Sequence, residues 1–334
     1  MDGKWNHKIF SVNEESFSSV ALGIFRFQYA NNPVYKAYVQ ALAIDPGKID
    51  SVYDIPFLPI SFFKTHKVST TLFEPQAVFE SSGTTGLATS RHYINDPGLY
   101  EESFGKGFER LYGKMNEWCI MGLLPSYLER KNSSLIYMVN KMIGESECRE
   151  SGFYLNEYAE LKKILTGLEN RKQKTLLIGV TFALLDFAEQ FQFPLYNTII
   201  METGGMKGRR KEMIREEVHN ELKRAFSIST VHSEYGMTEL LSQAYSKGNG
   251  IFECPPWMKV LVRDEDDPLN LQKPANGMTQ IEGRGVLNVI DLANIWSCSF
   301  IATEDAGKVF EDGSFEVQGR VDSSDIRGCN LLIA

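Results

Sequence analysis

A short run of hydroxyl-bearing residues and glycines carries the clearest chemical signal in the sequence. Residues 81–86 read Ser-Ser-Gly-Thr-Thr-Gly and directly follow an apolar stretch at 77–79 that has the composition of a strand. Glycines let backbone N–H groups approach a bound anion, and Ser and Thr hydroxyls add donors for phosphate oxygens. The run predicts a phosphate-binding loop, and its alternative is a flexible surface loop. The loop residues are Ser82, Gly83, Thr84, Thr85 and Gly86.

The loop differs from two common nucleotide-binding motifs. The pattern G-x-x-x-x-G-K-[ST] needs a lysine that reaches the outer phosphates. Here Gly83 and Gly86 are too close together, and no lysine follows before Lys106. The dinucleotide fingerprint G-x-G-x-x-G is also absent. The sequence therefore indicates a phosphate loop of another class.

Three further blocks follow this loop in an order that resembles the adenylate-forming superfamily. Residues 234–239 (Glu-Tyr-Gly-Met-Thr-Glu) resemble its Y-G-x-T-E block, and residues 303–307 stand where it has a T-G-D block. Residues 319–322 with 326–328 resemble its hinge block G-R-x-D-x-x-x-K-x-R-G. The resemblance implies an α/β fold with parallel sheets covered by helices, followed by a C-terminal β-rich subdomain.

Within the superfamily, the chain is most similar to the acyl-protein synthetases of bacterial bioluminescence. Segments 55–64 and 123–135 and the ending Arg327-Gly328-Cys329 carry this likeness, which extends over nearly the whole chain. The resemblance implies an AMP-forming acid–thiol ligase that uses ATP and Mg²⁺ to activate a fatty acid. It further implies that Cys329 carries the acyl group, which then passes to a partner, either a reductase or a carrier protein.

The resemblance also implies a role for each matched residue. Glu239 would hold Mg²⁺, and Thr238 would contact the α-phosphate. Tyr235, in the same block as Gly236, would stack on adenine. The loop glycines and hydroxyls would bind the phosphates. The backbone at Gly204 and Gly205 would lie opposite Tyr235 at the adenine. Asp305 would bind the ribose hydroxyls, with Arg320 close by.

Every one of these residues also has a purely structural interpretation. Single matches are compatible with a turn at Thr84, a helix-start carboxylate at Glu239 and a core tyrosine at Tyr235. Asp305 lies in Glu-Asp-Ala-Gly, which alone is an ordinary turn sequence. Cys329 precedes an apolar ending and alone is typical of a small packing residue.

Departures from the superfamily pattern concern positive charge. Leu87 and Ala88 stand where the loop usually has Pro-Lys, so Arg91 becomes the nearest cation and a candidate phosphate ligand. Asp325 replaces the hinge lysine, and no lysine follows Lys308. We therefore expect the C-terminal lid domain, which carries the adenylation lysine, to be absent. Charge stabilisation at the α-phosphate stays unassigned and is expected from a partner subunit.

Hydrophobic periodicity indicates the elements that must position these residues. Apolar residues at helical spacing predict helices over 17–27 and 34–42, and Asp96-Pro97 predicts the start of another. Apolar runs predict strands, and helical patterns follow two of them, as expected for a mainly parallel sheet. The strands are expected at 118–123, 175–180 and 197–201, and the helices at 181–191 and 207–226.

After residue 245 the pattern changes to short apolar runs between Gly, Asp and Pro turns, which indicates β structure. These runs are 257–263, 278–281, 285–292, 308–310 and 314–317. We expect one adenylate-forming domain over 1–319, with a helical entry at 1–70, an α/β core at 71–245 and a β-rich part at 246–319. Residues 320–334 are expected to form a truncated hinge and tail.

Composition narrows the functional class. The chain has 334 residues, 43% of them apolar, and a net charge of −8, which gives no support to nucleic-acid binding. The N-terminus lacks a signal-peptide run, and the longest apolar stretch is too short for a membrane span, so we expect a cytoplasmic protein. Five scattered cysteines and five scattered histidines lack metal-site spacing. Cys119 and Cys298 are expected in the core, and His232 is interpreted as a packing residue.

Two alternatives to the acyl-protein synthetase remain open at this point. One is an aryl- or acyl-CoA ligase that resembles phenylacetate ligases. The other is a catalytically degenerate scaffold that binds nucleotide or acyl chains. The acid's identity and chain length, the physiological acceptor and the oligomeric state are not encoded in any pattern of the sequence.

Overall fold

The computed structural model describes residues 3–81, 89–125, 132–204, 213–265, 267–273 and 282–321. The chain divides into two compact units that are discontinuous in sequence. The first comprises Met1–Ser103, Thr238–Ser242 and Glu253–Ala334, and the second comprises Phe104–Met237 and Gln243–Phe252. None of the helices in the described ranges is long and apolar enough to cross a membrane.

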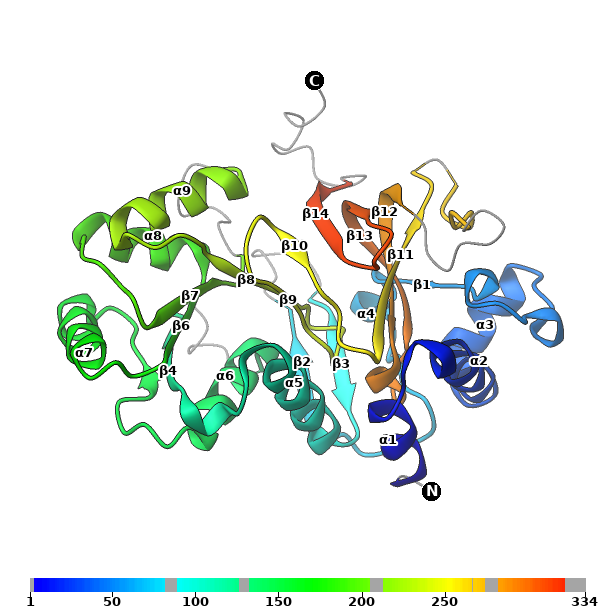
Figure 1. Cartoon of the computed structure of the whole chain (residues 1–334). Coiled ribbons are helices and arrows are strands. Elements are labelled where there is room, and N and C mark those ends of the chain that lie inside the picture. Colours follow the sequence, from blue (N-terminus) through cyan, green and yellow to red (C-terminus); the bar gives the residue numbers. More distant parts are fainter. Residues whose placement is uncertain are drawn as a thin grey trace. The chain divides into compact units, whose positions relative to one another are not determined.

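The first unit combines N-terminal helices with an antiparallel sheet (Figure 1). The sheet has the order β14-β13-β12-β11, and the short strand β1 runs parallel to β13. A separate hairpin pairs β2 with β3. The helices are α1 (Gly3–Phe10), α2 (Glu14–Asn31), α3 (Pro33–Ala41) and α4 (Phe62–Thr65), and the strands are β1 (Leu58–Pro59), β2 (Ala77–Glu80), β3 (Arg91–Ile94), β11 (Met258–Arg263), β12 (Gly283–Asp291), β13 (Phe300–Val309) and β14 (Phe315–Arg320). Short 3₁₀ turns are η1 (Pro46–Lys48), η2 (Val52–Asp54) and η4 (Leu292–Asn294).

Helix α2 contacts the far end of the chain through a buried amide. Gln28 Nε2 donates to the carbonyl oxygens of Asn294 (3.1 Å) and Ile295 (2.9 Å), and its Oε1 accepts from Ser299 N at 2.9 Å. Phe25 on the same helix packs edge-on against Phe300 at the start of β13. The core of this unit thus depends on residues nearly 270 positions apart in sequence.

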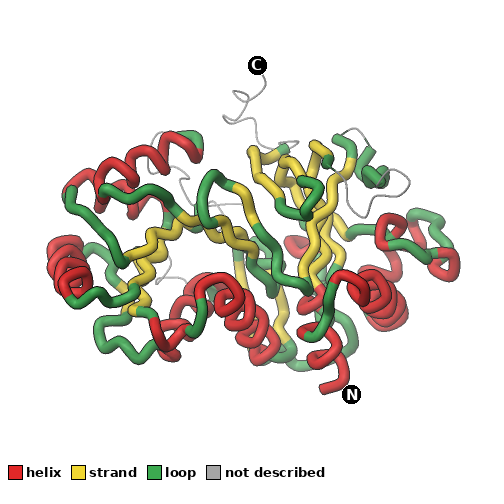
Figure 2. Tube along the Cα trace, in the orientation of Figure 1, coloured by secondary structure: helices red, strands yellow, loops and turns green. Residues whose placement is uncertain are grey.

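The second unit is built around a mainly parallel sheet of order β5-β4-β6-β7-β8-β9, in which only β9 runs antiparallel to its neighbour. Figure 1 shows α8 and α9 on one face of this sheet and α6 on the other, and Figure 2 shows the strands in yellow between helices in red. Its elements are η3 (Met115–Glu117), β4 (Cys119–Leu123), α6 (Ser134–Glu145), β5 (Gly152–Phe153), α7 (Tyr158–Asn170), β6 (Thr175–Gly179), α8 (Thr181–Gln190), β7 (Thr198–Glu202), α9 (Arg215–Phe226), β8 (His232–Tyr235), β9 (Ala244–Ser246) and β10 (Ile251–Phe252). Helix α5 (Pro97–Tyr112) begins in the first unit and ends in the second.

Most expected elements are confirmed, including the two N-terminal helices, the helix that starts at Pro97 and the three predicted parallel strands. Two boundaries were wrong. Helix α9 begins at Arg215 rather than Lys207, because Glu217 Oε2 accepts the backbone N–H of Ile214 (3.1 Å) and caps the helix there. Strand β13 begins at Phe300, so the stretch 303–307 is strand rather than turn. The predicted run 278–281 lies outside the described residues.

A close approach of two strands requires a glycine at position 307. The register between β13 and β14 shifts between Ala306 and Gly307, and a Cβ on Gly307 would lie 2.2 Å from the carbonyl oxygen of Glu316. Real Cβ atoms do not approach an oxygen so closely, so any side chain here must push the strands apart.

We expect Gly307→Ala to lower the free energy of unfolding by about 2 kcal/mol or more, because backbone atoms must move. Gly319→Ala in β14 is the matched control, since a Cβ there meets nothing within 4 Å. Urea denaturation of both variants measures the difference. Equal midpoints would contradict the close-approach interpretation.

Candidate functional site

The predicted phosphate loop is flanked by the hairpin β2–β3. Ser81 N donates to Ser90 O (3.1 Å), and Ser90 N donates to Ser81 Oγ (2.9 Å), so the two ends of the segment are tied together. Residues 82–88 lie outside the described residues, which includes Ser82, Gly83, Thr84, Thr85 and Gly86. Arg91 opens β3, and its Nε contacts Glu80 Oε1 at 3.2 Å while the side chain is 58% exposed.

Glu239 is a buried carboxyl group of the first unit. It lies in a turn after β8, not at a helix start, and is 5% exposed. Burial raises its pKa, and a hydrogen bond from Ser90 and the positive charges of Arg320 and Lys64 partly offset this. A buried carboxylate with incomplete charge compensation is suited to a cation, and Mg²⁺ takes oxygen ligands of this kind.

No group of three His, Cys, Asp or Glu side chains within the described ranges is arranged to hold a metal ion. Mg²⁺ commonly uses one or two protein carboxylates and takes its other ligands from substrate phosphates and water. The single carboxylate of Glu239 therefore fits a Mg²⁺–nucleotide complex better than a protein-only metal site.

Three side chains of the first unit hold the backbone around Glu239. His92 Nδ1 lies 2.8 Å from Thr238 O, and because a carbonyl only accepts, Nδ1 carries the proton. Asn294 Nδ2 donates to Glu239 O at 2.7 Å, and Asp291 accepts the backbone N–H groups of Leu241 (2.7 Å) and Ser242 (3.0 Å). The segment 238–242 is thus fixed by side chains from β3 and from the end of β12.

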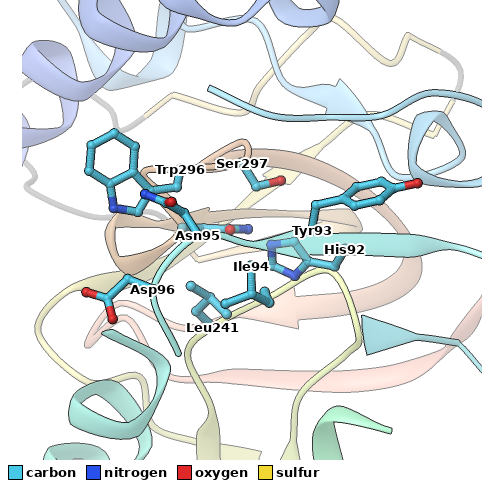
Figure 3. A pocket seen from close by; sticks show the side chains of 9 residues that line it. His92, Tyr93, Ile94, Asn95, Asp96, Leu241, Trp296 and Ser297 are labelled. Atoms are coloured by element: carbon cyan, nitrogen blue, oxygen red, sulfur yellow. The ribbon is translucent and has the colours of Figure 1, made fainter. Parts of the chain in front are cut away.

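Two of these anchoring groups have strongly shifted pKa values. Burial lowers the pKa of His92 to about 4, so its imidazole is neutral near pH 7. Burial raises the pKa of Asp291 to about 6, although four hydrogen bonds favour its charged form. Figure 3 shows His92 and Leu241 beside a small pocket, which Asn294 and Trp296 also line.

Asp305 and Arg320 form an ion pair across two strands. They are register partners on β13 and β14, and Arg320 Nε donates to Asp305 Oδ1 at 3.1 Å. The Asp305 side chain is 9% exposed and that of Arg320 is 55% exposed. The structure therefore brings together the two residues that the resemblance assigned to the ribose.

The second unit contains the remaining described candidates. Gly204 follows β7 with a φ of +73°, and its N–H donates to Glu202 Oε2 at 2.7 Å. Glu202 also accepts from the hydroxyl of Thr181 at 3.3 Å. The carboxylate at the end of β7 therefore bonds both to the turn at Gly204 and to the start of α8. Tyr235 ends β8, is buried, and lies 5.8 Å from the Phe252 ring centroid. Gly205 lies outside the described residues.

Glu202 and Glu234 form a pair of carboxyl groups with opposite pKa shifts. For Glu202, burial is outweighed by His219, Arg215 and the Gly204 N–H, so its pKa is lowered. For Glu234, burial together with the charge of Glu202 raises the pKa to about 8. Glu234 folds over Gly236, where a Cβ would meet its Oε1 at 2.4 Å. These opposite shifts favour a neutral Glu234 and an ionised Glu202 near pH 7.

With this geometry in place, comparison with known proteins gives the family. The family model described as "Acyl-protein synthetase, LuxE" matches residues 9–334. The chain belongs to this family. No curated protein sequence matches the chain.

Among solved structures, ATP-bound MatB from Rhodopseudomonas palustris shares 14% identity with a TM-score of 0.52, over 86% of this chain and 58% of that one. O-succinylbenzoate coenzyme A synthetase (MenE) from Bacillus subtilis, in complex with AMP, shares 16% identity with a TM-score of 0.47, over 76% of this chain and 50% of that one. The chain thus spans only about half to three-fifths of these proteins. The likeness to MatB shows that this acyl-protein synthetase family member has the fold of adenylate-forming enzymes.

Sequence reasoning missed the residues that support the site. Asp291 and Asn294 lie at the end of a predicted strand, and an Asp-x-x-Asn sequence after an apolar run is a turn signal that could have found them. His92 and Glu202 had no local signal, since their importance comes from contacts distant in sequence.

His232 behaves as a packing residue beside Tyr112, with Nδ1 3.1 Å from its hydroxyl. Cys119 and Cys298 are buried, as predicted.

The carboxyl pair makes the stability of this protein depend on pH. The unfolded state ionises Glu234 above about pH 4.5, whereas the folded state keeps the proton until about pH 8. Unfolding therefore becomes relatively more favourable as the pH rises through this window. We expect Glu234→Gln to gain stability over the wild type between pH 5 and 8, by roughly 2–4 kcal/mol at the upper end.

The control variant is Glu216→Gln, which removes one exposed carboxylate from α9 of the same unit. Chemical denaturation at pH 5, 6.5 and 8 gives the free energies. A Glu234→Gln difference that does not change with pH would show that Glu234 is ionised throughout this range.

Proposed function

We propose that this protein activates a fatty or related carboxylic acid with ATP and transfers the acyl group to a protein cysteine. The observation that carries the proposal is Glu239, whose carboxyl group is buried and whose backbone carbonyl is held by Asn294, within the Y-G-x-T-E-like block of a chain that belongs to the acyl-protein synthetase family. A carboxylate is a poor electrophile, so an enzyme that acylates a thiol must first give it a better leaving group.

In the first step, an oxygen of the acid's carboxylate bonds to the α-phosphorus of ATP. The bond from that phosphorus to the bridging oxygen breaks, and pyrophosphate leaves with the electron pair. The loop residues Thr84 and Thr85, with Ser82, would donate to the leaving phosphates, and Thr238 would contact the α-phosphate. Bound Mg²⁺ would spread the negative charge of the phosphates.

The chain's own residues would orient the nucleotide. Glu239 would hold the metal ion, and its carboxyl group is oriented by the fixed backbone and by the hydrogen bond from Ser90. Asp305, oriented by Arg320, would accept hydrogen bonds from the ribose hydroxyls. Tyr235 with Gly236, and the turn at Gly204 and Gly205, would pack against adenine. Arg91 would serve as a phosphate ligand in place of the usual loop lysine.

In the second step, the thiolate of Cys329 bonds to the acyl carbon, and AMP leaves with the electrons of the broken acyl–phosphate bond. The acyl group then passes from this thioester to an acyl-accepting partner protein, such as a reductase or carrier.

We further propose that the domain boundary lies near residue 319, that the tail over 320–334 carries the acyl group, and that the protein acts in the cytoplasm. The charge that stabilises the α-phosphate would come from the partner.

Glu239→Gln tests the metal role. The amide keeps the shape but loses the charge that attracts Mg²⁺, so we expect acid-dependent ATP–pyrophosphate exchange to fall by about 10²-fold. Raised Mg²⁺ or added Mn²⁺ should restore part of the rate. Glu304→Gln, an exposed neighbour of Asp305, is the control. Identical metal dependence in Glu239→Gln and wild type would remove the assignment.

Cys329→Ser separates the acyl-protein synthetase from its competitors. Activation does not need the thiol, so pyrophosphate release should continue, while the hydroxylamine-labile acyl label on the protein disappears. Cys148→Ser, which removes a partly buried thiol, should keep the label. A label that persists in Cys329→Ser, or equal transfer to free coenzyme A, would favour a CoA ligase. ATP binding without pyrophosphate release for any acid would favour a scaffold.

A further inference from the structure

We propose that Asp291 and Asn294 are positioning residues that set the metal affinity of Glu239. The proposal rests on the proposed function, since it assumes that Glu239 binds Mg²⁺. It assigns a role to the turn between β12 and β13 that no matched motif covers.

Asp291 joins two segments through one fully buried carboxylate. Its Oδ2 accepts from the backbone of Leu241 (2.7 Å) and Ser242 (3.0 Å). Its Oδ1 accepts from Ser242 Oγ (2.6 Å) and from Ala293 N (3.1 Å), which closes the turn η4. The same side chain therefore fixes the turn and the segment 238–242 to each other.

Asn294, at the end of that turn, contacts the backbone of Glu239 itself. Its Nδ2 donates to Glu239 O at 2.7 Å, and its side chain also hydrogen-bonds to His92, which lies 2.8 Å from Thr238 O. The two side chains that hold the consecutive carbonyls of residues 238 and 239 therefore also hold each other. Removing the Asn294 amide removes both contacts.

The preceding carbonyl, that of Thr238, is held by a side chain from strand β3. His92 donates to Thr238 O, and Ser90, two residues earlier, contacts the Glu239 carboxyl group. Consecutive carbonyls at 238 and 239 are thus both fixed, and the Glu239 carboxyl group itself accepts a hydrogen bond from Ser90. Groups that orient a metal ligand in this way typically change metal affinity 10- to 100-fold when removed.

The chain offers a matched control for Asn294. Asn32 is also buried in the first unit, and its Nδ2 donates to a backbone carbonyl, that of Ser297, at 2.9 Å. Among the described residues, the Asn32 side chain bonds to Thr70, Ser297 and Tyr35 and to no residue of the segment 238–242. Asn294→Ala and Asn32→Ala therefore remove the same kind of bond, but only the first removes an anchor of Glu239.

The test uses the full chain and measures Mg²⁺-dependent ATP binding by calorimetry, with no carboxylic acid substrate present. Thermal unfolding measures stability, and hydrogen exchange of peptides that cover 238–242 measures how firmly this segment is held. We expect Asn294→Ala to raise the Mg²⁺ concentration for half-saturation about tenfold and to speed exchange in this segment. Asn32→Ala should lower the unfolding temperature at least as much but leave the Mg²⁺ dependence within about twofold of wild type. Asp291→Asn should act like Asn294→Ala.

Each outcome decides one statement. If Asn294→Ala loses stability but keeps the wild-type Mg²⁺ dependence, the anchor is structural only and this inference is wrong. If wild type binds ATP with no dependence on Mg²⁺, the proposed metal role of Glu239 fails, and with it the inference. If both asparagine variants weaken Mg²⁺ binding equally, loss of stability explains the effect, and the positioning role is rejected.

Discussion

The segment 238–242 depends on one buried negative charge. Asp291 is removed from water, and within the described part of the chain its charge is compensated by two backbone N–H groups of the segment, by the hydroxyl of Ser242 and by the N–H of Ala293 in its own turn. Hydrogen bonds to a carboxylate are stronger than neutral ones and cannot be given up cheaply in a dry interior. The position of Glu239 follows, because its neighbours on the C-terminal side cannot move independently of β12.

The acidic side chains of this protein illustrate how donors, rather than burial alone, decide the charge state. Glu202 and Glu234 are both desolvated, yet their pKa values move in opposite directions because Glu202 faces His219, Arg215 and a backbone amide. Glu239 is intermediate, with a raised pKa and only partial compensation. An added cation would stabilise the ionised form of Glu239 most, because its charge is only partly compensated. The charge of Glu202 is already compensated by groups of its own unit.

The sequence was sufficient for the class of most elements that it predicted, but not for the contacts that hold the site. The parallel strands and the helix at Pro97 followed from hydrophobic periodicity and capping, which act locally. Strand β13 was only partly predicted because Thr303–Gly307 contains Glu, Asp and Gly, residues typical of turns, and its pairing with β12 overrides that local preference. His92 and Asn294 reach Thr238 and Glu239 from 146 and 55 residues away, and a single sequence contains no signal for such pairs.

The long-range contacts of Gln28 also constrain how the chain reaches its native state. On the ribosome, α2 emerges early, but its buried amide and the face around Phe25 require residues 294–300, which are made about 270 residues later. Contacts of such high sequence separation slow folding, because a long loop must close before they form. The second unit has all its strands synthesised by residue 252, so it can complete its core while the first unit still waits. During that interval the nascent chain exposes the apolar face of α2 around Phe25, which becomes buried only after Phe300 has been made.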